Sequence, residues 1–263
     1  MATAEVTRWS DALLEVLEPE GLVVKRVGKR PSEHSSRVYA GQLAKEPLAI
    51  REGDATFLCD LDDGLATGVY LDLSHARLRA KGLSQGGEVL NLFAYTSTFS
   101  VQAALGGATR VTSVDTSRRA LRRGRANMAA SGLDSDAHRW FADDVLEHLG
   151  RAGRRKDRYQ LVVVDPPAYG RSGRRQFVFE RDLDELVQGS LALLADGGSM
   201  VLTSHVTTLG VDRLRRSVDR AADVLKMHTS KAEVMEPPWD CPMGDPGSGG
   251  ENVGVLVLRF DSK

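Results

Sequence analysis

The sequence predicts an α/β fold built on a mostly parallel, twisted β-sheet. The chain has 263 residues, of which 41% are hydrophobic and 27% are charged, so it can bury a sizeable core. From about residue 87 onward, short apolar runs alternate with segments of helical spacing. Because strand-helix alternation requires right-handed crossovers, it favours parallel strands buried beneath helices.

Each element of this sheet follows from one segment of the chain. Strands are expected at 88–93, 110–114, 160–164 and 199–203. Helices are expected at 99–105, 117–130, 145–149, 181–194 and 212–225. Two final strands, near 229–235 and 253–260, enclose a loop rich in proline and glycine and are expected to add an antiparallel hairpin at one sheet edge.

The residues before this alternation predict a small, β-rich N-terminal unit. Alternating apolar and polar residues at 55–61 indicate a strand, and Asp62-Asp63-Gly64 indicates a turn after it. An apolar-periodic stretch from Trp9 to Leu17 lies upstream. We therefore expect two domains, residues 1–80 and residues 81–263.

Composition and charge exclude several classes of protein. No run approaches 18 apolar residues and the N-terminus lacks an export signal, so we expect a cytoplasmic protein without membrane contact. Cys59 and Cys241 have no second cysteine or histidine at metal-ligand spacing, so neither zinc nor a disulfide framework is expected. The formal net charge of −1 argues against bulk electrostatic binding of nucleic acid, although arginines cluster at 118–125, 151–158, 171–175 and 213–216.

Ligands of an open α/β sheet bind beyond the carboxyl ends of its strands, where this sequence places polar groups. The first strand leads into a turn of small and hydroxyl residues, 94–98, which is not a G-x-G-x-x-G motif. The second ends at Asp115, whose carboxylate can accept both hydroxyls of a ribose. At a later strand-to-helix junction, one carboxylate of Asp143-Asp144 can cap the helix while the other faces an adenine amino group.

The most specific signal is Asp165-Pro166-Pro167-Ala168-Tyr169, which follows an apolar strand. Two consecutive prolines cannot continue a strand ladder, so they impose a rigid loop that presents a carboxylate, carbonyls and a ring together. A planar base stacked on Tyr169 could be held by Asp165 and the Pro166 carbonyl. The alternative is a rigid turn with a packing tyrosine.

These motifs resemble those of class I S-adenosylmethionine-dependent methyltransferases, and among them the bacterial large-subunit ribosomal RNA methyltransferases that modify cytosine or guanine. The resemblance runs from about Gly41 to Phe260. It is carried by Gly64–Asp72 with Arg77, Leu90–Phe99, Gly106–Ala108, Ser113–Ser117, Asp143–Val145 and Asp165–Pro167. The resemblance implies a Rossmann-like fold, S-adenosylmethionine as cofactor, RNA as partner and no metal.

The resemblance also implies a set of site residues. The residues expected to bind the cofactor are Arg77, Asn91, Phe93, Tyr95, Thr96, Ser97, Thr98, Asp115, Thr116, Asp143, Asp144 and Asp165. Among them, Arg77 is expected to hold the methionine carboxylate, Asp115 the ribose and Asp144 the adenine. The residues expected to act in catalysis are Asp165, Pro166 and Tyr169.

Three departures from the family pattern bear on the activity. Ser97 replaces the glycine of a Y-T-G turn, and residues 1–50 do not resemble the RNA-binding module of many relatives. Thr203-Ser204-His205-Val206 stands where cytosine carbon-5 methyltransferases carry a cysteine. Since carbon methylation requires a covalent thiolate adduct, we expect methylation of a base nitrogen in ribosomal RNA.

Several alternatives stay open at this point. The protein could methylate a small aromatic or amine metabolite, could be an inactive methyltransferase-like binding protein, or could methylate carbon 5 of cytosine in RNA. His205 could act as a general base, and the loop carrying Cys241 could fold over the site.

Overall fold

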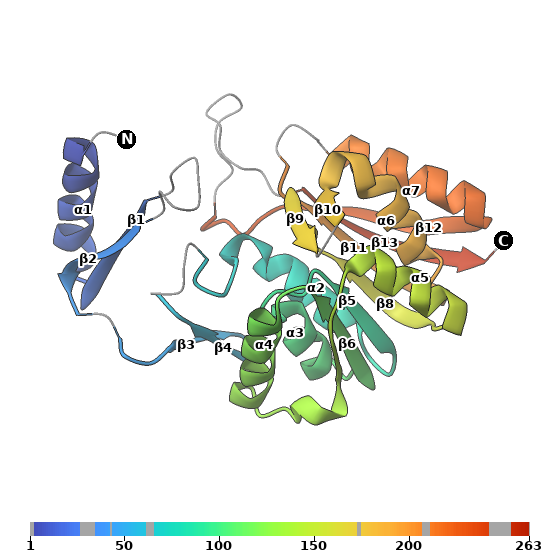
Figure 1. Cartoon of the computed structure of the whole chain (residues 1–263), viewed down its shortest axis with the longest axis horizontal. Helices are drawn as coiled ribbons and strands as arrows, with labels where there is room; N and C mark the ends of the chain where they lie inside the picture. Colours follow the sequence, from blue (N-terminus) through green and yellow to red (C-terminus); the bar gives the residue numbers. More distant parts are fainter. Residues whose placement is uncertain are drawn as a thin grey trace. The chain divides into compact units, whose positions relative to one another are not determined.

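The computed structural model describes residues 3–26, 35–42, 44–61, 66–172, 175–206, 211–241 and 254–262. The chain forms two compact units (Figure 1). One comprises Met1–Ile50 and Phe57–Val69, and the other comprises Arg51–Thr56 and Tyr70–Lys263. The expected domain boundary near residue 80 stays a prediction.

The first unit holds short strands and one helix, as the sequence predicts for the N-terminal region. Its helix is α1 (Thr3–Leu17), and β1 (Gly21–Arg26) pairs antiparallel with β2 (Ser35–Gly41). Glycine is required at Gly41 because φ is +69° and an added Cβ would lie 2.0 Å from the carbonyl oxygen of Glu20. A separate two-stranded sheet, whose residues are divided between the two units, joins β3 (Leu48–Glu52) and β4 (Ala55–Cys59) and confirms the strand expected from residue 55. The turn expected at Asp62 to Gly64 lies outside the described residues.

The second unit is built on a seven-stranded sheet with the order β12-β13-β11-β8-β5-β6-β7 (Figure 1). Its strands are β5 (Glu88–Leu92), β6 (Arg110–Asp115), β7 (Arg139–Ala142), β8 (Tyr159–Val164), β11 (Leu194–Ser204), β12 (Met227–Met235) and β13 (Gly254–Ser262). The five strands from β11 to β7 are parallel, whereas β13 runs antiparallel to both β11 and β12. This topology confirms the mostly parallel sheet with a terminal antiparallel hairpin.

Helices cover both faces of this sheet, which explains why most residues of its central strands are buried. The helices are α2 (Ser74–Leu83), α3 (Thr98–Leu105), α4 (Arg118–Ala130), α5 (Val145–Arg155), α6 (Phe179–Leu191) and α7 (Val211–Leu225), with short 3-10 turns η2 (Leu71–Leu73) and η3 (Ser135–Ala137). Along β8, Leu161 and Val163 pack with α2 and α3, while Val162 and Val164 pack with α5, α6 and α7. Within the described residues, no helix is long and apolar enough to span a membrane.

The structure differs from the sequence expectations at several element boundaries. The helix expected at 181–194 spans Phe179–Leu191, and the strand expected from 199 already begins at Leu194. The reason is an irregular register between Leu194 and Ser199, where Gly197 has a φ of +68° and interrupts the apolar run. The helix expected at 145–149 continues to Arg155 through polar residues. No pattern predicted α2.

A short hairpin between β8 and α6 was also not predicted. It consists of β9 (Tyr169–Ser172) and β10 (Arg175–Val178), which pair antiparallel directly after the two prolines. Of the arginine cluster at 171–175, residues 173 and 174 lie outside the described residues.

Candidate active site

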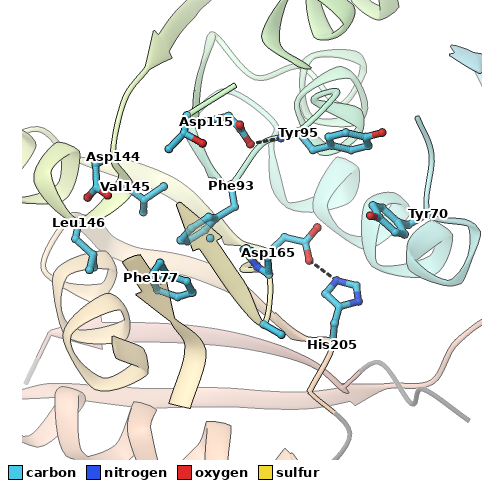
Figure 2. A pocket seen from close by; sticks show the side chains of 14 residues that line it. Tyr70, Phe93, Tyr95, Asp115, Asp144, Val145, Leu146, Asp165, Phe177 and His205 are labelled. Atoms are coloured by element: carbon cyan, nitrogen blue, oxygen red, sulfur yellow. Dashed lines mark hydrogen bonds and ion pairs between the residues drawn. The ribbon is translucent and has the colours of Figure 1, made fainter. Parts of the chain in front are cut away.

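A cavity of about 400 Å³ lies at the carboxyl ends of β5, β6 and β8 (Figure 2). Its lining residues come from the segments that follow β5, β6, β7, β8 and β11, from the start of α5, from the β9-β10 hairpin and from the residue before η2. They are Tyr70, Phe93, Tyr95, Asp115, Thr116, Asp144, Val145, Leu146, Asp165, Pro167, Ala168, Gly170, Phe177 and His205. The chain topology thus brings the strand-end residues of the sequence analysis to one place.

The loop after β5 owes its shape to a left-handed backbone. Phe93, Tyr95 and Ser97 have φ values of 57°, 47° and 59°, a region that non-glycine residues rarely adopt. Ser97 therefore keeps the left-handed conformation at the position where the family pattern has glycine. Its buried hydroxyl has no hydrogen-bond partner among the described residues, and an added Cβ on Gly124 would lie only 2.5 Å from it. Strain of this kind concentrates at functional sites.

Asp115 ends β6 with its carboxylate held by backbone donors. The N–H groups of Tyr95 and Ser117 each donate to one carboxylate oxygen at 2.8 Å. Burial raises the pKa of Asp115, and these two hydrogen bonds only partly offset that effect. The carboxylate keeps further acceptor capacity next to the cavity, which suits neutral hydroxyl donors.

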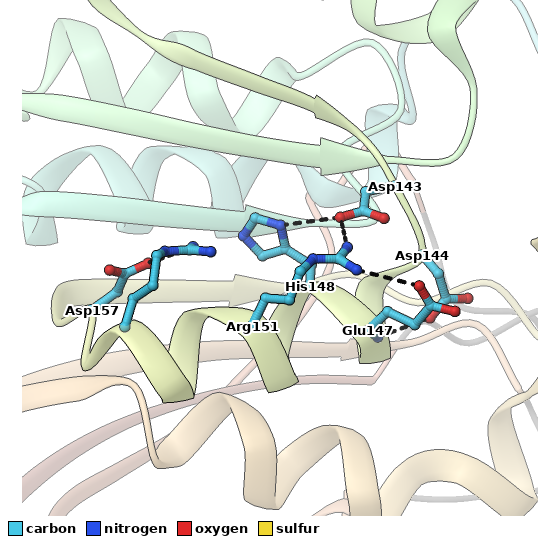
Figure 3. Close-up of polar contacts among 7 residues, drawn as sticks. Asp143, Asp144, Glu147, His148, Arg151 and Asp157 are labelled. Carbon is cyan, nitrogen blue, oxygen red and sulfur yellow. Dashed lines mark hydrogen bonds and ion pairs between the residues drawn. The ribbon is translucent and has the colours of Figure 1, made fainter.

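The two adjacent carboxylates after β7 have different surroundings (Figure 3). Asp144 lines the cavity and also caps α5, because its Oδ1 accepts a hydrogen bond from the Glu147 N–H at 3.0 Å. Asp143 does not line the cavity: it is ion-paired with Arg151, and its Oδ2 lies 3.5 Å from His148 Nδ1. His148 is buried, and burial lowers its pKa.

Asp165 stands at the other end of the cavity, just after β8. Its Oδ1 accepts a hydrogen bond from the Thr203 hydroxyl and lies 3.0 Å from His205 Nε2. The Tyr70 ring lies 5.8 Å from the His205 ring and 5.9 Å from the Tyr95 ring. An aromatic row therefore borders the open side of Asp165 (Figure 2).

Several residues expected to bind the cofactor lie outside the cavity lining. The buried guanidinium of Arg77 forms a two-armed ion pair with Glu52 and donates to the Tyr70 carbonyl at 2.7 Å. Asn91 is buried and donates to the Ser100 hydroxyl at 2.8 Å. These contacts give both residues partners within the fold.

The remaining expected residues also lie outside the cavity lining. Thr96 is buried, and its carbonyl accepts a hydrogen bond from the Asn127 amide at 2.9 Å. Thr98 begins α3, and Pro166 is buried and does not line the cavity. Tyr169 is 71% exposed on β9 and does not line the cavity.

Some lining residues were missed by sequence reasoning. Val145 and Leu146 belong to the buried face of α5, and their apolar character was indistinguishable from ordinary core packing. Phe177 comes from the unpredicted β9-β10 hairpin and packs on Phe93 with ring centroids 4.9 Å apart. Tyr70 belongs to the segment 64–72, which contributes to the family resemblance but from which no site residue was predicted.

Comparison with known proteins places this geometry in a family. A family model described as S-adenosylmethionine-dependent methyltransferase matches residues 22–257. The ribosomal RNA large subunit methyltransferase of Deinococcus radiodurans is 33% identical over 223 residues, covering 80% of this chain and 55% of that protein. The ribosomal RNA large subunit methyltransferase K/L of Pseudomonas syringae is 37% identical over 199 residues, covering 74% of this chain and 26% of that protein. The chain thus spans about half the length, or less, of these curated relatives.

Solved structures agree with the family match. The crystal structure of SMU.776 with SAH has a TM-score of 0.86 and 26% identity, and the similarity covers 98% of this chain and 67% of that one. It confirms the Rossmann-like methyltransferase fold. Because the family model spans most of the sequence, the chain belongs to the S-adenosylmethionine-dependent methyltransferase family, whose cofactor is S-adenosylmethionine.

Proposed function

We propose that the protein transfers a methyl group from S-adenosylmethionine to a base nitrogen in RNA, with ribosomal RNA as the expected substrate and the cytoplasm as the expected location. The observation that carries the proposal is a cavity with Asp115 at one end and Asp165 at the other. This arrangement offers one carboxylate for the cofactor and another for the acceptor.

The residues present fit the cofactor. A volume of about 400 Å³ is typical of small-ligand sites. The apolar side chains of Phe93, Val145 and Leu146 would enclose the adenine beside Asp144, and Asp115 would accept the ribose hydroxyls. When bound, S-adenosylmethionine supplies an electrophilic methyl group on its sulfonium.

The strained loop after β5 would bind the methionine end of the cofactor. The guanidinium of Arg77 is engaged by Glu52 and by the Tyr70 carbonyl, so a role in holding the methionine carboxylate requires those contacts to change. Phe93 and Tyr95 of this loop line the cavity and would lie beside the methionine end of the cofactor.

The acceptor would be oriented by Asp165. A carboxylate oxygen can accept a hydrogen bond from an amino group and so direct the nitrogen lone pair toward the methyl group, with positioning supplying most of the rate. Tyr169, exposed on β9, would stack on the base at the mouth of the site rather than inside the cavity.

A nitrogen acceptor is favoured over carbon 5 of cytosine by the position of the thiols. Carbon methylation needs a thiolate at the base, and no cysteine is among the described residues that line the cavity. Burial raises the pKa of Cys241, and nearby Asp240 and Asp72 raise it further, so its thiol is a poor nucleophile.

An RNA partner is supported by the names of the relatives and by the first turns of α4. This helix begins three residues after Asp115, and its exposed Arg118 and Arg122 have no ion pair within the described residues. Arginines at a helix N-terminus oppose the helix dipole, and like charges four residues apart repel each other. Phosphate groups would relieve both effects at the edge of the cavity.

The proposed function can be tested with labelled cofactor. Ribosomal RNA from a strain that lacks the gene should accept the methyl label, and mapping should place the label on a base nitrogen. Label on carbon 5 of cytosine, or transfer only to a small aromatic amine, would contradict the proposal.

A further inference from the structure

We infer that His205 is a positioning residue that orients Asp165 and makes methyl transfer depend on its own protonation. The inference rests on the proposed function and goes further, because it specifies an acceptor that carries a proton on its nitrogen. It assigns a role to a histidine that the family motifs do not include.

The sheet register brings the three side chains together. β8 and β11 are parallel with Val164 opposite Leu202, so the residues that follow, Asp165 and Thr203, are neighbours at the carboxyl edge. His205 comes immediately after β11 ends at Ser204. These positions account for the contacts of Thr203 and His205 with the same oxygen, Asp165 Oδ1.

Two contacts to one oxygen fix the orientation of the carboxylate. With Oδ1 held, the other oxygen is directed away from β11, toward the space bordered by Tyr70 and Tyr95 (Figure 2). An acceptor amino group in that space would meet a pre-oriented oxygen, which avoids the cost of ordering the side chain during reaction.

The charge of the lining makes His205 distinctive. The ionisable side chains of the described lining are three carboxylates (Asp115, Asp144 and Asp165), two tyrosines and His205. No lysine or arginine is among the described lining residues. Asp165 and Tyr70 are titratable side chains that contact the His205 ring. Protonation of His205 therefore converts its pair with Asp165 from a net charge of −1 to zero.

This charge matters for an acceptor that must lose a proton. As the new nitrogen–carbon bond formed, the sulfonium–methyl bond would break with its electron pair left on sulfur, giving a neutral thioether. The attacking nitrogen would become positive, and its proton could pass to Asp165 and then to water. A charged imidazolium on Oδ1 weakens the carboxylate as an acceptor. Turnover should therefore decline as the pH falls through the range in which an imidazole takes up a proton.

Two substitutions separate these functions. His205→Gln keeps an N–H donor for Asp165 but cannot titrate, whereas His205→Ala removes the donor. Wild-type turnover should fall roughly tenfold between about pH 7.5 and pH 5.5. The glutamine variant should keep at least a third of the turnover at high pH without that decline, and the alanine variant should lose about tenfold or more at every pH.

The control is His228→Gln, which changes an exposed histidine on β12 and should leave the wild-type pH profile unchanged. Cofactor affinity, measured by calorimetry, should stay within about twofold in both His205 variants. A decline with pH that persists in His205→Gln, or full turnover in His205→Ala, would overturn the inference.

A second readout needs no methyl transfer. In a titration of the histidine ring signals by NMR, Asp165→Asn should move the His205 midpoint to lower pH by about one unit, because a carboxylate favours the charged imidazole. A midpoint that does not move would overturn the role of His205 whatever the substrate. Absence of methyl transfer by the wild-type protein would instead overturn the proposed function.

Discussion

Asp115 and Asp184 show how one side-chain type acquires opposite properties in two regions of the molecule. Asp184 lies on α6 and is contacted from α7 by Ser217 at 2.6 Å, Arg213 at 3.0 Å and Arg220 at 2.9 Å. Burial alone would raise the pKa of Asp184, but these hydrogen bonds outweigh it and lower the pKa to about 2. Asp115 lines the cavity; within the described residues its hydrogen-bond donors are backbone N–H groups, and burial raises its pKa.

The two shifts have opposite consequences for stability. The lowered pKa of Asp184 means that its contribution is present above the unfolded value of about 3.9 and is lost as the pH falls toward about 2. The raised pKa of Asp115 means that ionisation opposes folding: the cost is absent below the unfolded pKa of about 3.9, grows as the pH rises above that value, and is complete above the folded pKa. Asp184, which is paired with arginines, contributes to stability, whereas the Asp115 carboxylate can still accept hydrogen bonds from a ligand.

The largest expected effect is the loss of turnover when Asp165, at the acceptor end of the cavity, is replaced. Asp165→Ala should reduce turnover by about 100-fold or more, because the acceptor nitrogen loses the group that orients it. Asp184→Ala is the matched control and should keep normal turnover. Methyl-transfer rates measured at saturating cofactor check this prediction, and equal losses in both variants would remove the distinction between the two regions.

Cofactor affinity should depend on Asp115 and not on Asp184. Asp115→Ala removes charge-assisted hydrogen bonds worth about 1.5–3 kcal/mol, so the affinity for S-adenosylmethionine should fall roughly 10-fold to 100-fold. Calorimetry measures this directly. Unchanged affinity would remove Asp115 from the cofactor site.

Arginines with and without a carboxylate partner should also differ in their contribution to RNA binding. Arg118 and Arg122 on α4 have no ion pair within the described residues, whereas Arg213 and Arg220 on α7 bind Asp184. The logarithm of RNA affinity should fall linearly with the logarithm of salt concentration. In an Arg118→Ala, Arg122→Ala variant, that slope should become shallower by about 0.7 for each phosphate that is no longer neutralised. An Arg213→Ala, Arg220→Ala variant should keep the wild-type slope. Identical slopes in both variants would argue against a phosphate surface on α4.

The smallest effect concerns stability. Asp184 is about half exposed, so solvent screening limits the value of its pairs, and Asp184→Ala should lower the free energy of unfolding by about 0.2–1 kcal/mol at neutral pH. The loss should disappear as the pH approaches about 2. Denaturant unfolding at several pH values provides the measurement, and a difference that grows on acidification would contradict the sign derived above.

Although no range was predicted for β7 (Arg139–Ala142), most of the sheet was predictable because strands such as β8 contain short apolar runs bounded by turns. The helix α2 was not, because its sequence, Ser74 to Leu83, is polar overall and gains its buried face from Ala76, Arg77 and Ala80. A search for apolar periodicity does not detect a helix whose buried face includes an arginine. The β9-β10 hairpin escaped prediction because its strands are only four residues long and lie within a polar, glycine-containing segment.

Site residues at the ends of strands were predictable. Residues whose side chains are engaged by another side chain of the protein were harder to predict. Asp115, Asp144 and Asp165 reach the cavity because parallel strands deliver their ends to one edge. Asp143, one residue from Asp144, is instead ion-paired with Arg151, eight residues further along the chain on α5. Which of two adjacent carboxylates forms an ion pair depends on the direction in which the following helix points its arginine side chain. The sequence motif alone does not determine that direction.

A crystal structure with S-adenosylhomocysteine would show whether Asp115 and Asp165 stand at the two ends of the bound cofactor. Both ribose hydroxyls should lie within hydrogen-bond distance of Asp115, and the adenine should lie between Phe93 and Leu146 beside Asp144. The sulfur should lie on the side of the ligand nearer Asp165. A ligand bound elsewhere, or a ribose that does not touch Asp115, would contradict the assignment of this cavity to the cofactor.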